Sequence, residues 1–241
     1  MKQVDILGIP FHVITVDETL DLLESYLDEP RNHIIVTPNP EGVMQARRNP
    51  AAREAFLDAD LRLADGTGIV LASRYLGQAL PERVRGVDTI FTLLERLTAK
   101  GRKHTAYFLG GAPGIAERAK AQAESRFLHL TVVGHHHGFF TPEEETAILE
   151  ELNSLKPDIL LVCTGMPRAE IWATTHRNIP ARLTLCLGGT IDILAGNVKL
   201  APPLMRKLGL EWLHRLIRQP SRAKRQLDIP RFVFAVLRGT R

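Results

Sequence analysis

The sequence predicts an α/β fold with a mostly parallel sheet flanked by helices. Short apolar, β-branched runs alternate with longer segments whose apolar residues recur at helical spacing, which is the pattern of βαβ units. The chain has 241 residues, 44% hydrophobic and 24% charged, which is ordinary for one globular domain or one domain plus an appendage. These observations favour a Rossmann-like arrangement over disorder, collagen or a disulfide scaffold.

Five apolar runs are the expected strands, and each is followed by a turn. They lie at 34–37, 106–109, 130–133, 158–163 and 183–187. Helices are predicted at 16–27, 68–76, 87–99, 113–126, 142–155 and 167–175. The fifth helix has the clearest start, because Thr141 can cap it, Pro142 suits its first position and Glu144 completes a capping box.

The last part of the chain differs from the rest in charge. Between residues 204 and 241, ten Lys or Arg face only two acids, Glu211 and Asp228, so this segment carries +8 while the whole chain carries +4. Its apolar residues recur at helical spacing, interrupted by Pro220 and Pro230. We therefore predict an α/β domain at 1–200 and a basic helical appendage at 201–241 that meets an anionic partner.

The sequence also bears on the cellular compartment. No apolar run approaches the roughly 18 to 20 residues that a membrane-spanning helix needs. Asp5 stands where a signal peptide would begin its apolar core, so we expect a protein of the reducing cytoplasm. Cys163 and Cys186 lie inside apolar strands and are expected to be small core residues.

Two loops offer side chains with catalytic chemistry. In open α/β sheets ligands bind beyond the carboxyl ends of the strands, where these loops are expected. Thr37 and Asn39 follow the first predicted strand, and Asn39 is either a ligand contact or only a helix cap. Asp65 stands before Gly66 and a helix, where it is either a general base toward a hydroxyl or part of an Asx turn.

Three further turns are candidates for binding a nucleotide. Gly110, Gly111 and Gly114 lie between a strand and a helix, where backbone N–H groups and the helix dipole can receive a phosphate. The next predicted strand ends in Val133-Gly134-His135 without the acid that would hold an NAD ribose, which disfavours NAD. The other two turns lie at 164–170 and 188–192, and they either form two walls of one crevice or are only structural. Their candidate binding residues are Gly165, Pro167, Glu170, Gly189 and Asp192.

Two patterns resemble metal sites only weakly. Asp58 and Asp60 match the Asp-x-Asp pair of metal-dependent sugar-nucleotide transferases, but such short matches recur by chance. His135, His136 and His137 are consecutive, and adjacent side chains converge on one metal less easily than i, i+4 pairs. We therefore expect no metal cofactor, and interpret the histidines as a solvated loop or the rim of a pocket.

Taken in order, these motifs resemble a known family over nearly the whole chain. The strings are TPNPEGVM, ADLRLADGTGIVLASRYLG, LPERVRGVD, FLGGAPG, GFFTPEEE, PDILLVCTGMPRAE, LGGTIDILAG and APPLMRKLGLEWLHRLIRQPSRAKR. They resemble the WecG/TagA/CpsF family of bacterial glycosyltransferases. The resemblance implies transfer of N-acetylmannosamine, its uronic acid or another hexose from a UDP-sugar to a polyprenyl-diphosphate-linked acceptor, in the synthesis of cell-surface polysaccharide or teichoic acid.

The resemblance also implies roles for residues of this chain. The threonine and asparagine of the family's TPNP loop match Thr37 and Asn39, its proposed catalytic aspartate matches Asp65, and an arginine of its LPERV stretch matches Arg83. The basic residues of its C-terminal appendage match Arg215, Arg222 and Arg225. The family resembles an inverting, metal-independent group, so UDP-sugar is expected as a substrate and no cofactor is expected.

Three positions depart from the family's usual pattern. Ala64 stands where the family usually has proline before Asp-Gly, and Leu200 replaces a position that is often basic. Ala169 replaces the glutamine of Pro-Arg-Gln-Glu, which removes an amide donor and acceptor from the presumed sugar pocket. The resemblance therefore does not fix the donor sugar.

The implied reaction is a single in-line displacement at the anomeric carbon. Asp65 would accept the proton of the acceptor hydroxyl, Thr37 and Asn39 would orient the sugars, and the glycines at 110–114 would hold the diphosphate. Without a metal, helix dipoles and arginines such as Arg83 are the groups available to stabilise the departing UDP.

The appendage is expected to bring the enzyme to the membrane. Its basic residues would bind anionic headgroups and the acceptor diphosphate, while Trp212, Leu213, Phe232 and Phe234 would enter the interface. The expected location is therefore cytoplasmic and peripheral, on the inner face of the cytoplasmic membrane.

Two other classes of protein fit the sequence less well than a glycosyltransferase does. An NAD-type oxidoreductase would need the missing ribose acid, and a nucleic-acid-binding module with a basic arm would need a basic body and more aromatic residues than the 6% present. We therefore expect no nucleic acid partner, and the sequence leaves a homo-oligomer open.

Overall fold

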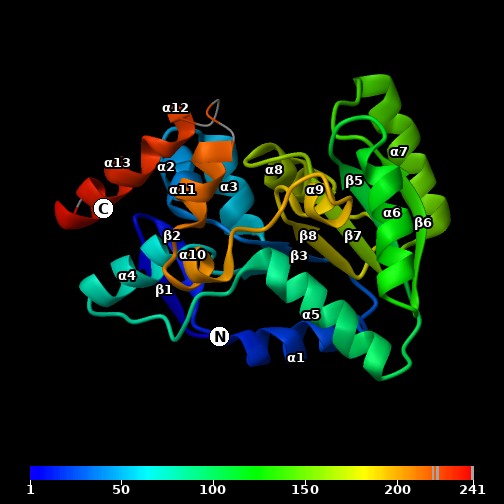
Figure 1. Ribbon diagram of the computed structural model, residues 1–241, viewed down its shortest axis with the longest axis horizontal. Helices are drawn as coiled ribbons and strands as arrows, with labels where there is room; N and C mark the ends of the chain where they lie inside the picture. Colours follow the sequence, from blue (N-terminus) through cyan, green and yellow to red (C-terminus); the bar gives the residue numbers. More distant parts are fainter. Residues whose placement is uncertain (219, 221–222, 240–241) are drawn as a thin grey trace.

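The protein is built around a six-stranded parallel sheet, as the sequence predicts. The structure is a computed structural model that describes residues 1–218, 220 and 223–239. The strands lie in the order β4-β3-β8-β7-β5-β6, and every neighbouring pair is parallel (Figure 1). Helices cover both faces, so the Rossmann-like α/β fold is confirmed.

All five predicted strands are present, with ends that shift by up to three residues. They are β3 (His33–Val36), β5 (His104–Gly110), β6 (Leu130–His136), β7 (Ile159–Cys163) and β8 (Leu183–Cys186). The edge strand β4 (Leu61–Arg62) was not predicted, because two residues are too short to show a pattern. A separate antiparallel hairpin, β1 (Gln3–Ile6) and β2 (Ile9–His12), was also missed.

The predicted helices are also present, and two of them, α1 and α7, begin with a threonine capping box. The predicted helices are α1 (Val16–Tyr26), α4 (Thr67–Tyr75), α5 (Gly86–Ala99), α6 (Ile115–Arg126), α7 (Pro142–Leu155) and α8 (Arg168–Thr175). The body also contains three helices outside the predicted ranges, α2 (Pro40–Ala46), α3 (Pro50–Asp58) and α9 (Thr190–Leu194). The capping box of α7 is confirmed, with Thr141 N donating to Glu144 Oε2 at 2.7 Å. Helix α6 begins two residues later than predicted, because Gly114 adopts a left-handed φ of 79°.

Each face of the sheet has its own hydrophobic cluster. Helices α1, α5, α6 and α9 contribute side chains such as Leu23, Leu93 and Ile191 to one cluster. The β1–β2 hairpin and helices α2, α3, α4, α7 and α8 contribute residues such as Phe11 and Phe56 to the other. The strands fill both clusters, because alternate residues of a buried parallel strand point to opposite faces.

The neighbouring strands β3 and β8 mark a change of side in the chain's path. After β3 the chain enters α2 on one face, whereas after β8 it enters α9 on the other. Loops that leave neighbouring parallel strands in opposite directions create the place where α/β proteins bind ligands. The candidate residues of the sequence therefore need to be located along this carboxyl edge.

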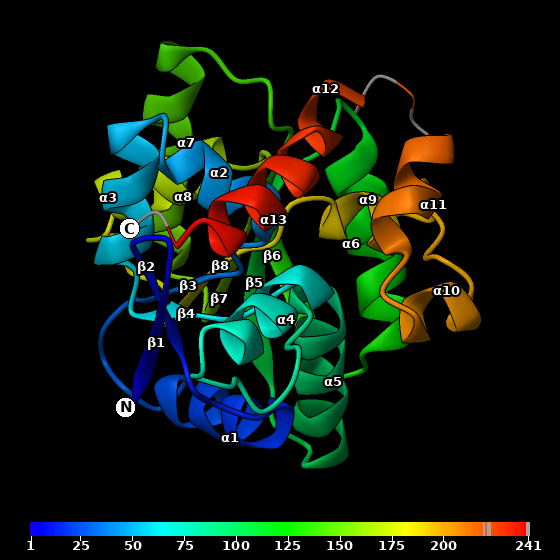
Figure 2. The same ribbon diagram turned by 90° about the vertical axis from the view of Figure 1, so that its left-hand side faces the viewer.

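The C-terminal segment packs against the body. It forms α10 (Pro203–Lys207), α11 (Glu211–Arg218), α12 (Ala223–Gln226) and α13 (Asp228–Leu237), and α13 contacts α2 and α4 (Figure 2). Phe232 is only 1% exposed, so the expectation that it enters a membrane interface is wrong: it completes the cluster beneath α2. Trp212 and Phe234 remain exposed. The division of the chain at residue 200 stays a prediction.

No helix within the described residues is both long and apolar enough to cross a membrane. The described cysteines, Cys163 and Cys186, are buried and unpaired, which confirms them as core residues. Burial raises the pKa of Cys163 to about 12, so its thiol stays protonated at neutral pH.

Replacing Phe232 tests whether α13 belongs to the core. Phe232→Ala is expected to lower the free energy of unfolding by about 3 kcal/mol or more, because it leaves a cavity in a buried cluster. Phe234→Ala is the matched control, since that ring is 54% exposed and two residues away. Urea unfolding measures both. Equal effects of the two substitutions would contradict the packing described for α13.

Candidate active site

The loop after β3 places Thr37 at the carboxyl edge of the sheet. Thr37 is 7% exposed, and its Oγ1 donates to the carbonyl oxygen of Cys186 at 3.5 Å, across the β3–β8 junction. A side chain at Gly86, the first residue of α5, would lie 3.0 Å from the Thr37 methyl and 2.6 Å from Leu187. The loops after β3 and β8 and the start of α5 are therefore packed into one tight cluster.

Asn39 has the structural role that the sequence analysis held open. Its Oδ1 accepts a hydrogen bond from Gly42 N at 3.0 Å, which caps α2. Gly66 sits against this turn, because an added Cβ there would lie 3.1 Å from Pro40 Cδ and 3.5 Å from Asn39 Cβ. The loops after β3 and β4 are thus in contact, which brings Asp65 next to the Thr37–Asn39 loop.

Arg83 links Asp65 to the C-terminal segment. Its Nη2 lies 3.3 Å from Asp65 Oδ1, and its Nη1 donates to both carboxylate oxygens of Glu211 on α11 at 2.9 Å. The side chains of Arg83 and Glu211 are 19% and 15% exposed. Burial alone would lower the pKa of Arg83, but Asp65 and Glu211 outweigh it and raise the pKa above its usual value. The guanidinium is therefore a permanent cation shared by two acids.

A second set of ion pairs extends this contact between body and appendage. Arg85 lies 3.6 Å from Glu211 and 2.8 Å from Asp88, and Arg206 of α10 pairs with Asp88 at 2.8 Å. Glu211 was missed as a site residue at the sequence level. Its charge could have revealed it, because Glu211 and Asp228 are the only acids in the segment of net charge +8. Both pair with arginines of the body, Asp228 with Arg48 at 2.7 Å.

The glycine loop after β5 lies against the loops after β6 and β7. Gly110 has a φ of 153°, and an added Cβ would lie 2.6 Å from the carbonyl oxygen of Cys163. Gly138 N donates to Gly111 O at 2.8 Å. Gly114 faces open space and precedes α6, whose start has no side-chain cap. The first turn of α6 therefore presents N–H groups and a positive dipole end, which suit an anion.

The remaining candidates lie around the next two turns. Gly165 has a φ of 88° with open space beside it, and Pro167 precedes α8, which also has no side-chain cap. Gly189 precedes α9. Asp192 Oδ1 accepts from Asn197 Nδ2 at 3.3 Å. The sheet order places these turns, after β7 and β8, between the glycine loop and the Thr37–Asp65 loops.

Glu170 differs from the other candidates because it is buried. Its carboxyl group is 2% exposed, its Oε2 has no partner among the described residues, and burial raises its pKa to about 7. Its role in donor binding stays a prediction.

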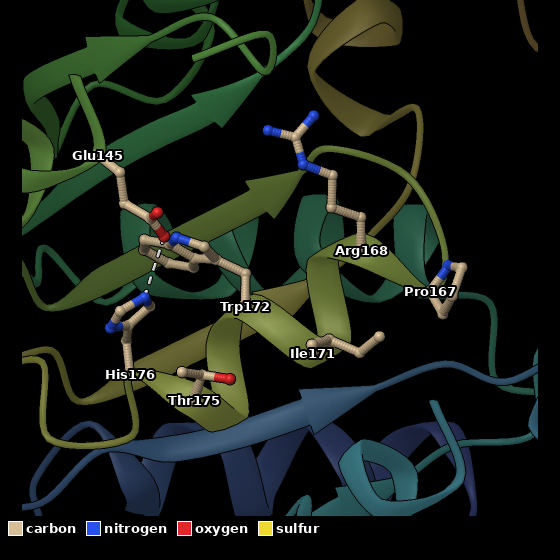
Figure 3. A pocket seen from close by; sticks show the side chains of 7 residues that line it. All are labelled: Glu145, Pro167, Arg168, Ile171, Trp172, Thr175 and His176. Carbon is tan, nitrogen blue, oxygen red and sulfur yellow. Dashed lines mark hydrogen bonds and ion pairs between the residues drawn. The ribbon is translucent and has the colours of Figure 1, made fainter. Parts of the chain in front are cut away.

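A cavity of about 370 Å³ opens beside Pro167, on the outer side of α8 (Figure 3). Its walls are Glu145, Arg168, Ile171, Trp172, Thr175 and His176. His176 Nε2 lies within hydrogen-bond distance of Glu145 Oε1, at 3.1 Å, and Arg168 lies over the Phe140 ring at 4.7 Å. None of the Thr37, Asp65 or Arg83 side chains lines this cavity, so it is separate from the site built around them.

Of the three arginines assigned to the acceptor, the structure describes one side chain. Arg225 Nε lies 3.7 Å from Glu41 Oε1, in the first turn of α2. Arg215 belongs to α11, and Arg222 lies outside the described residues. Their roles stay predictions.

Asp58 and Asp60 are held by arginine. Arg177 donates to Asp60 Oδ2 at 2.9 Å and to Asp58 Oδ2 at 3.1 Å, and Asp60 also accepts from Ile34 N at 2.9 Å. Ile34 lies near the start of β3, so these acids are at the amino end of the sheet, opposite the candidate site. Their carboxylates act as structural ion pairs.

The fold and the site together define a class. The protein is a Rossmann-like α/β protein in which a carboxylate–arginine pair, a threonine and uncapped helix starts line the carboxyl edge of one parallel sheet. This edge is where such folds bind nucleotides and carry out group transfer.

Comparison with known proteins identifies the family. The model of the glycosyl transferase WecG/TagA/CpsF family matches residues 4–241, and the chain belongs to this family. A Bacillus spizizenii protein is 33% identical over 90% of this chain and 83% of its own length. A Staphylococcus aureus protein is 31% identical over 99% of this chain and 94% of its own length. Both are named N-acetylglucosaminyldiphosphoundecaprenol N-acetyl-beta-D-mannosaminyltransferase.

Replacing Glu211 tests the tie between α11 and the site. Glu211→Ala leaves the partly buried Arg83 with less compensation, so we expect the free energy of unfolding to fall by about 2 kcal/mol. Segment 201–239 should also become easier for a protease to cut. Glu54→Ala, at an exposed acid within α3, is the control and should change stability by less than about 0.5 kcal/mol. Urea unfolding measures the stability of both variants, and limited proteolysis measures how readily the segment is cut. If the two variants behaved alike, Glu211 would not hold α11 to the site.

Proposed function

We propose that this glycosyltransferase moves a sugar from a UDP-sugar to a polyprenyl-diphosphate-linked sugar, with inversion and without a metal cofactor. The relatives' names describe an N-acetylmannosaminyl transfer to an N-acetylglucosaminyl-diphosphoundecaprenol acceptor, which supports the acceptor class. N-acetylmannosamine, its uronic acid and another hexose are the donor sugars to be compared. The single observation that carries the chemistry is the Asp65–Arg83 pair beside Thr37 and Asn39.

Asp65 acts as the general base in this proposal. As the acceptor hydroxyl oxygen attacks the anomeric carbon, its proton moves to the Asp65 carboxylate. The bond from the anomeric carbon to the UDP oxygen breaks, and UDP leaves with the electron pair. Attack from the face opposite the leaving group inverts the anomeric centre. Thr37, at the β3–β8 junction, is placed to orient the sugars.

Arg83 becomes a stronger electrostatic stabiliser as the reaction proceeds. In the free protein its charge is balanced by Asp65 and Glu211. When Asp65 takes up the proton, one of these negative charges disappears and the net charge of the trio rises by one. This increase coincides with the negative charge that develops on UDP, so the proton transfer itself strengthens stabilisation of the leaving group.

The uncapped helix starts supply the remaining stabilisation. Helices α6 and α8 start at the carboxyl edge without a side-chain acceptor on their first N–H groups, whereas Thr15 and Thr141 cap α1 and α7. A diphosphate at the α6 start would take the place of the missing cap. This supports a metal-independent reaction in which backbone N–H groups and arginines neutralise the phosphates.

We further propose that the enzyme works in the cytoplasm, peripherally on the inner face of the membrane. Leu204, Leu208 and Ile217 are 60% to 68% exposed, and Trp212 is 40% exposed. Arg218 is exposed on the same helix as Trp212. Apolar side chains beside cations suit an anionic lipid surface, which a soluble body can reach without a spanning helix.

Asp65→Asn tests the catalytic assignment. Turnover is expected to fall about 10²- to 10⁴-fold, because an amide of the same shape does not accept the acceptor proton. Transfer from a panel of UDP-sugars to a lipid-linked acceptor measures the effect. The control is Asp17→Asn, since that carboxylate is 84% exposed on α1. Near-normal turnover by folded Asp65→Asn protein that still binds UDP would rule out Asp65 as the base.

Neutralising three appendage arginines tests membrane binding. The triple substitution of Arg215, Arg222 and Arg225 to Gln should weaken binding to anionic vesicles about 100-fold, since each cation contributes about 1 kcal/mol. Flotation of the full chain with anionic and with neutral vesicles measures this. The control replaces Arg118, Lys120 and Arg126 of α6 with Gln, which removes the same charge elsewhere. If both triple variants lost the same vesicle affinity, the effect would depend on net charge alone, and the assignment of these three arginines to the membrane would be wrong.

A further inference from the structure

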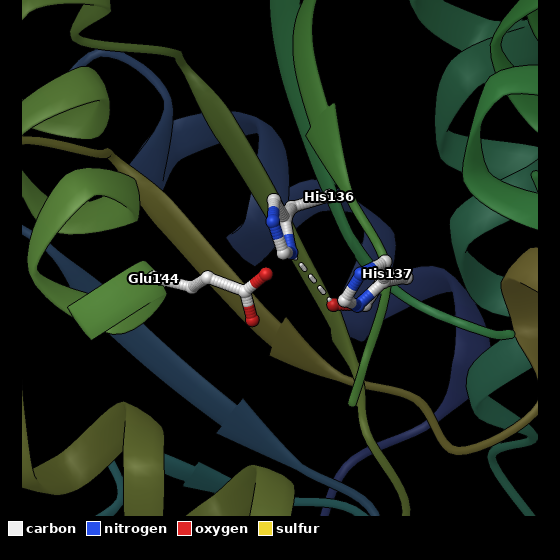
Figure 4. Close-up of side chains that lie close together, drawn as sticks. All are labelled: His136, His137 and Glu144. Atoms are coloured by element: carbon white, nitrogen blue, oxygen red, sulfur yellow. Dashed lines mark hydrogen bonds between the residues drawn. The ribbon is translucent and has the colours of Figure 1, made fainter. Parts of the chain in front are cut away.

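Two histidines and a glutamate meet at the loop between β6 and α7. His136 is the last residue of β6, His137 follows it, and Glu144 lies in the first turn of α7. One ligand atom from each lies within 4.8 Å of the others, and no other such group occurs in the part of the chain that is described. Figure 4 shows the Glu144 carboxylate turned toward the His136 ring, with the His137 ring beside it.

We propose that His136, His137 and Glu144 bind a divalent transition-metal ion of the zinc class. Two imidazole nitrogens and one carboxylate oxygen form a donor set that Zn²⁺ accepts, with a fourth position left for water. Adjacent histidines in a continuous strand converge poorly on one metal. Here the strand ends between them, and their ring centroids lie 4.3 Å apart. The proposal does not depend on the glycosyltransferase reaction.

Two of the ligands are already oriented by the backbone. His136 Nδ1 lies 2.9 Å from the His137 carbonyl oxygen, and because a carbonyl only accepts, Nδ1 carries the hydrogen and Nε2 keeps the lone pair. Glu144 Oε2 accepts from Thr141 N at 2.7 Å, which leaves Oε1 for a metal. Hydrogen bonds from the non-coordinating atoms to the backbone are the usual means by which proteins orient metal ligands.

His137 is the ligand that has to change on binding. Its Nδ1 accepts from Phe139 N at 3.3 Å, so its lone pair is occupied in the free protein. Coordination through Nδ1 displaces the Phe139 amide, and coordination through Nε2 moves the hydrogen to Nδ1. Either way this hydrogen bond, the longest of the three, is lost.

Metal binding would fix the loop beside the glycine turn. The loop continues from His137 to Gly138, whose amide donates to Gly111 O at 2.8 Å. An added Cβ on Gly138 would lie 3.3 Å from Gly110 Cα, so the two loops are in direct contact. The ion would join the end of β6 to the start of α7, next to the proposed diphosphate loop but apart from Asp65.

The test measures metal binding directly, with the full chain. Protein freed of metal with EDTA, and then of EDTA, is titrated calorimetrically with Zn²⁺, and we expect one equivalent to bind. Zn²⁺ affinity should fall at least about tenfold in each of His136→Ala, His137→Ala and Glu144→Gln. Replacing a residue that only hydrogen-bonds to a metal ligand already lowers metal affinity about tenfold or more, and these residues are proposed as the ligands themselves. Co²⁺ in place of Zn²⁺ adds an absorption spectrum that reports the ligands.

Matched variants separate binding from folding. Glu144→Gln keeps an oxygen acceptor for Thr141 N and so preserves the cap of α7. His135→Ala removes the neighbouring histidine of the triplet, and Glu143→Gln removes the neighbouring acid; both should bind Zn²⁺ as the parent does. Unfolding temperatures without metal show whether each variant folds. Absence of stoichiometric binding, or equal losses in the control variants, would overturn the proposal.

Discussion

Arg83 is the residue on which the arrangement of the site depends. One guanidinium joins Asp65, in the loop after β4, to Glu211 on α11, which lies 128 positions after Arg83 in the chain. A partly buried cation needs compensating negative charge, which Asp65 and Glu211 both supply. The candidate site and the C-terminal segment are therefore held together by the same charge, so the appendage contributes to the electrostatics of the candidate site.

The sheet topology explains why so many glycines are needed around this arginine. Six parallel strands end at one edge, and their loops must pass within van der Waals distance of one another. Gly66 against Pro40, Gly86 against Leu187 and Gly110 against Cys163 are three such points of close approach. A Cβ at any of them would push two loops apart. The glycines thus keep the proposed catalytic and phosphate-binding turns on one continuous edge.

The sequence predicted what depends on local pattern and missed what depends on distant partners. Buried runs such as Ile159–Cys163 and the capping box of Thr141 and Glu144 are visible locally, so those elements and the fold class were correct. Strand β4 is too short to show periodicity. Phe232 was placed in the membrane interface because its burial depends on α2, 190 positions away. For the same reason, Glu211 had no partner in the sequence until Arg83 was placed.

The C-terminal segment has two faces with different tasks. Its only acids, Glu211 and Asp228, pair with Arg83 and Arg48 of the body, and Phe232 enters the core. This leaves an outward side rich in cations and exposed apolar groups such as Trp212. Removal of the whole segment would therefore expose apolar core and unpair buried charges at the same time as it removed the outward face. Only substitutions on the outer surface can distinguish a role in membrane binding from a role in holding the site together.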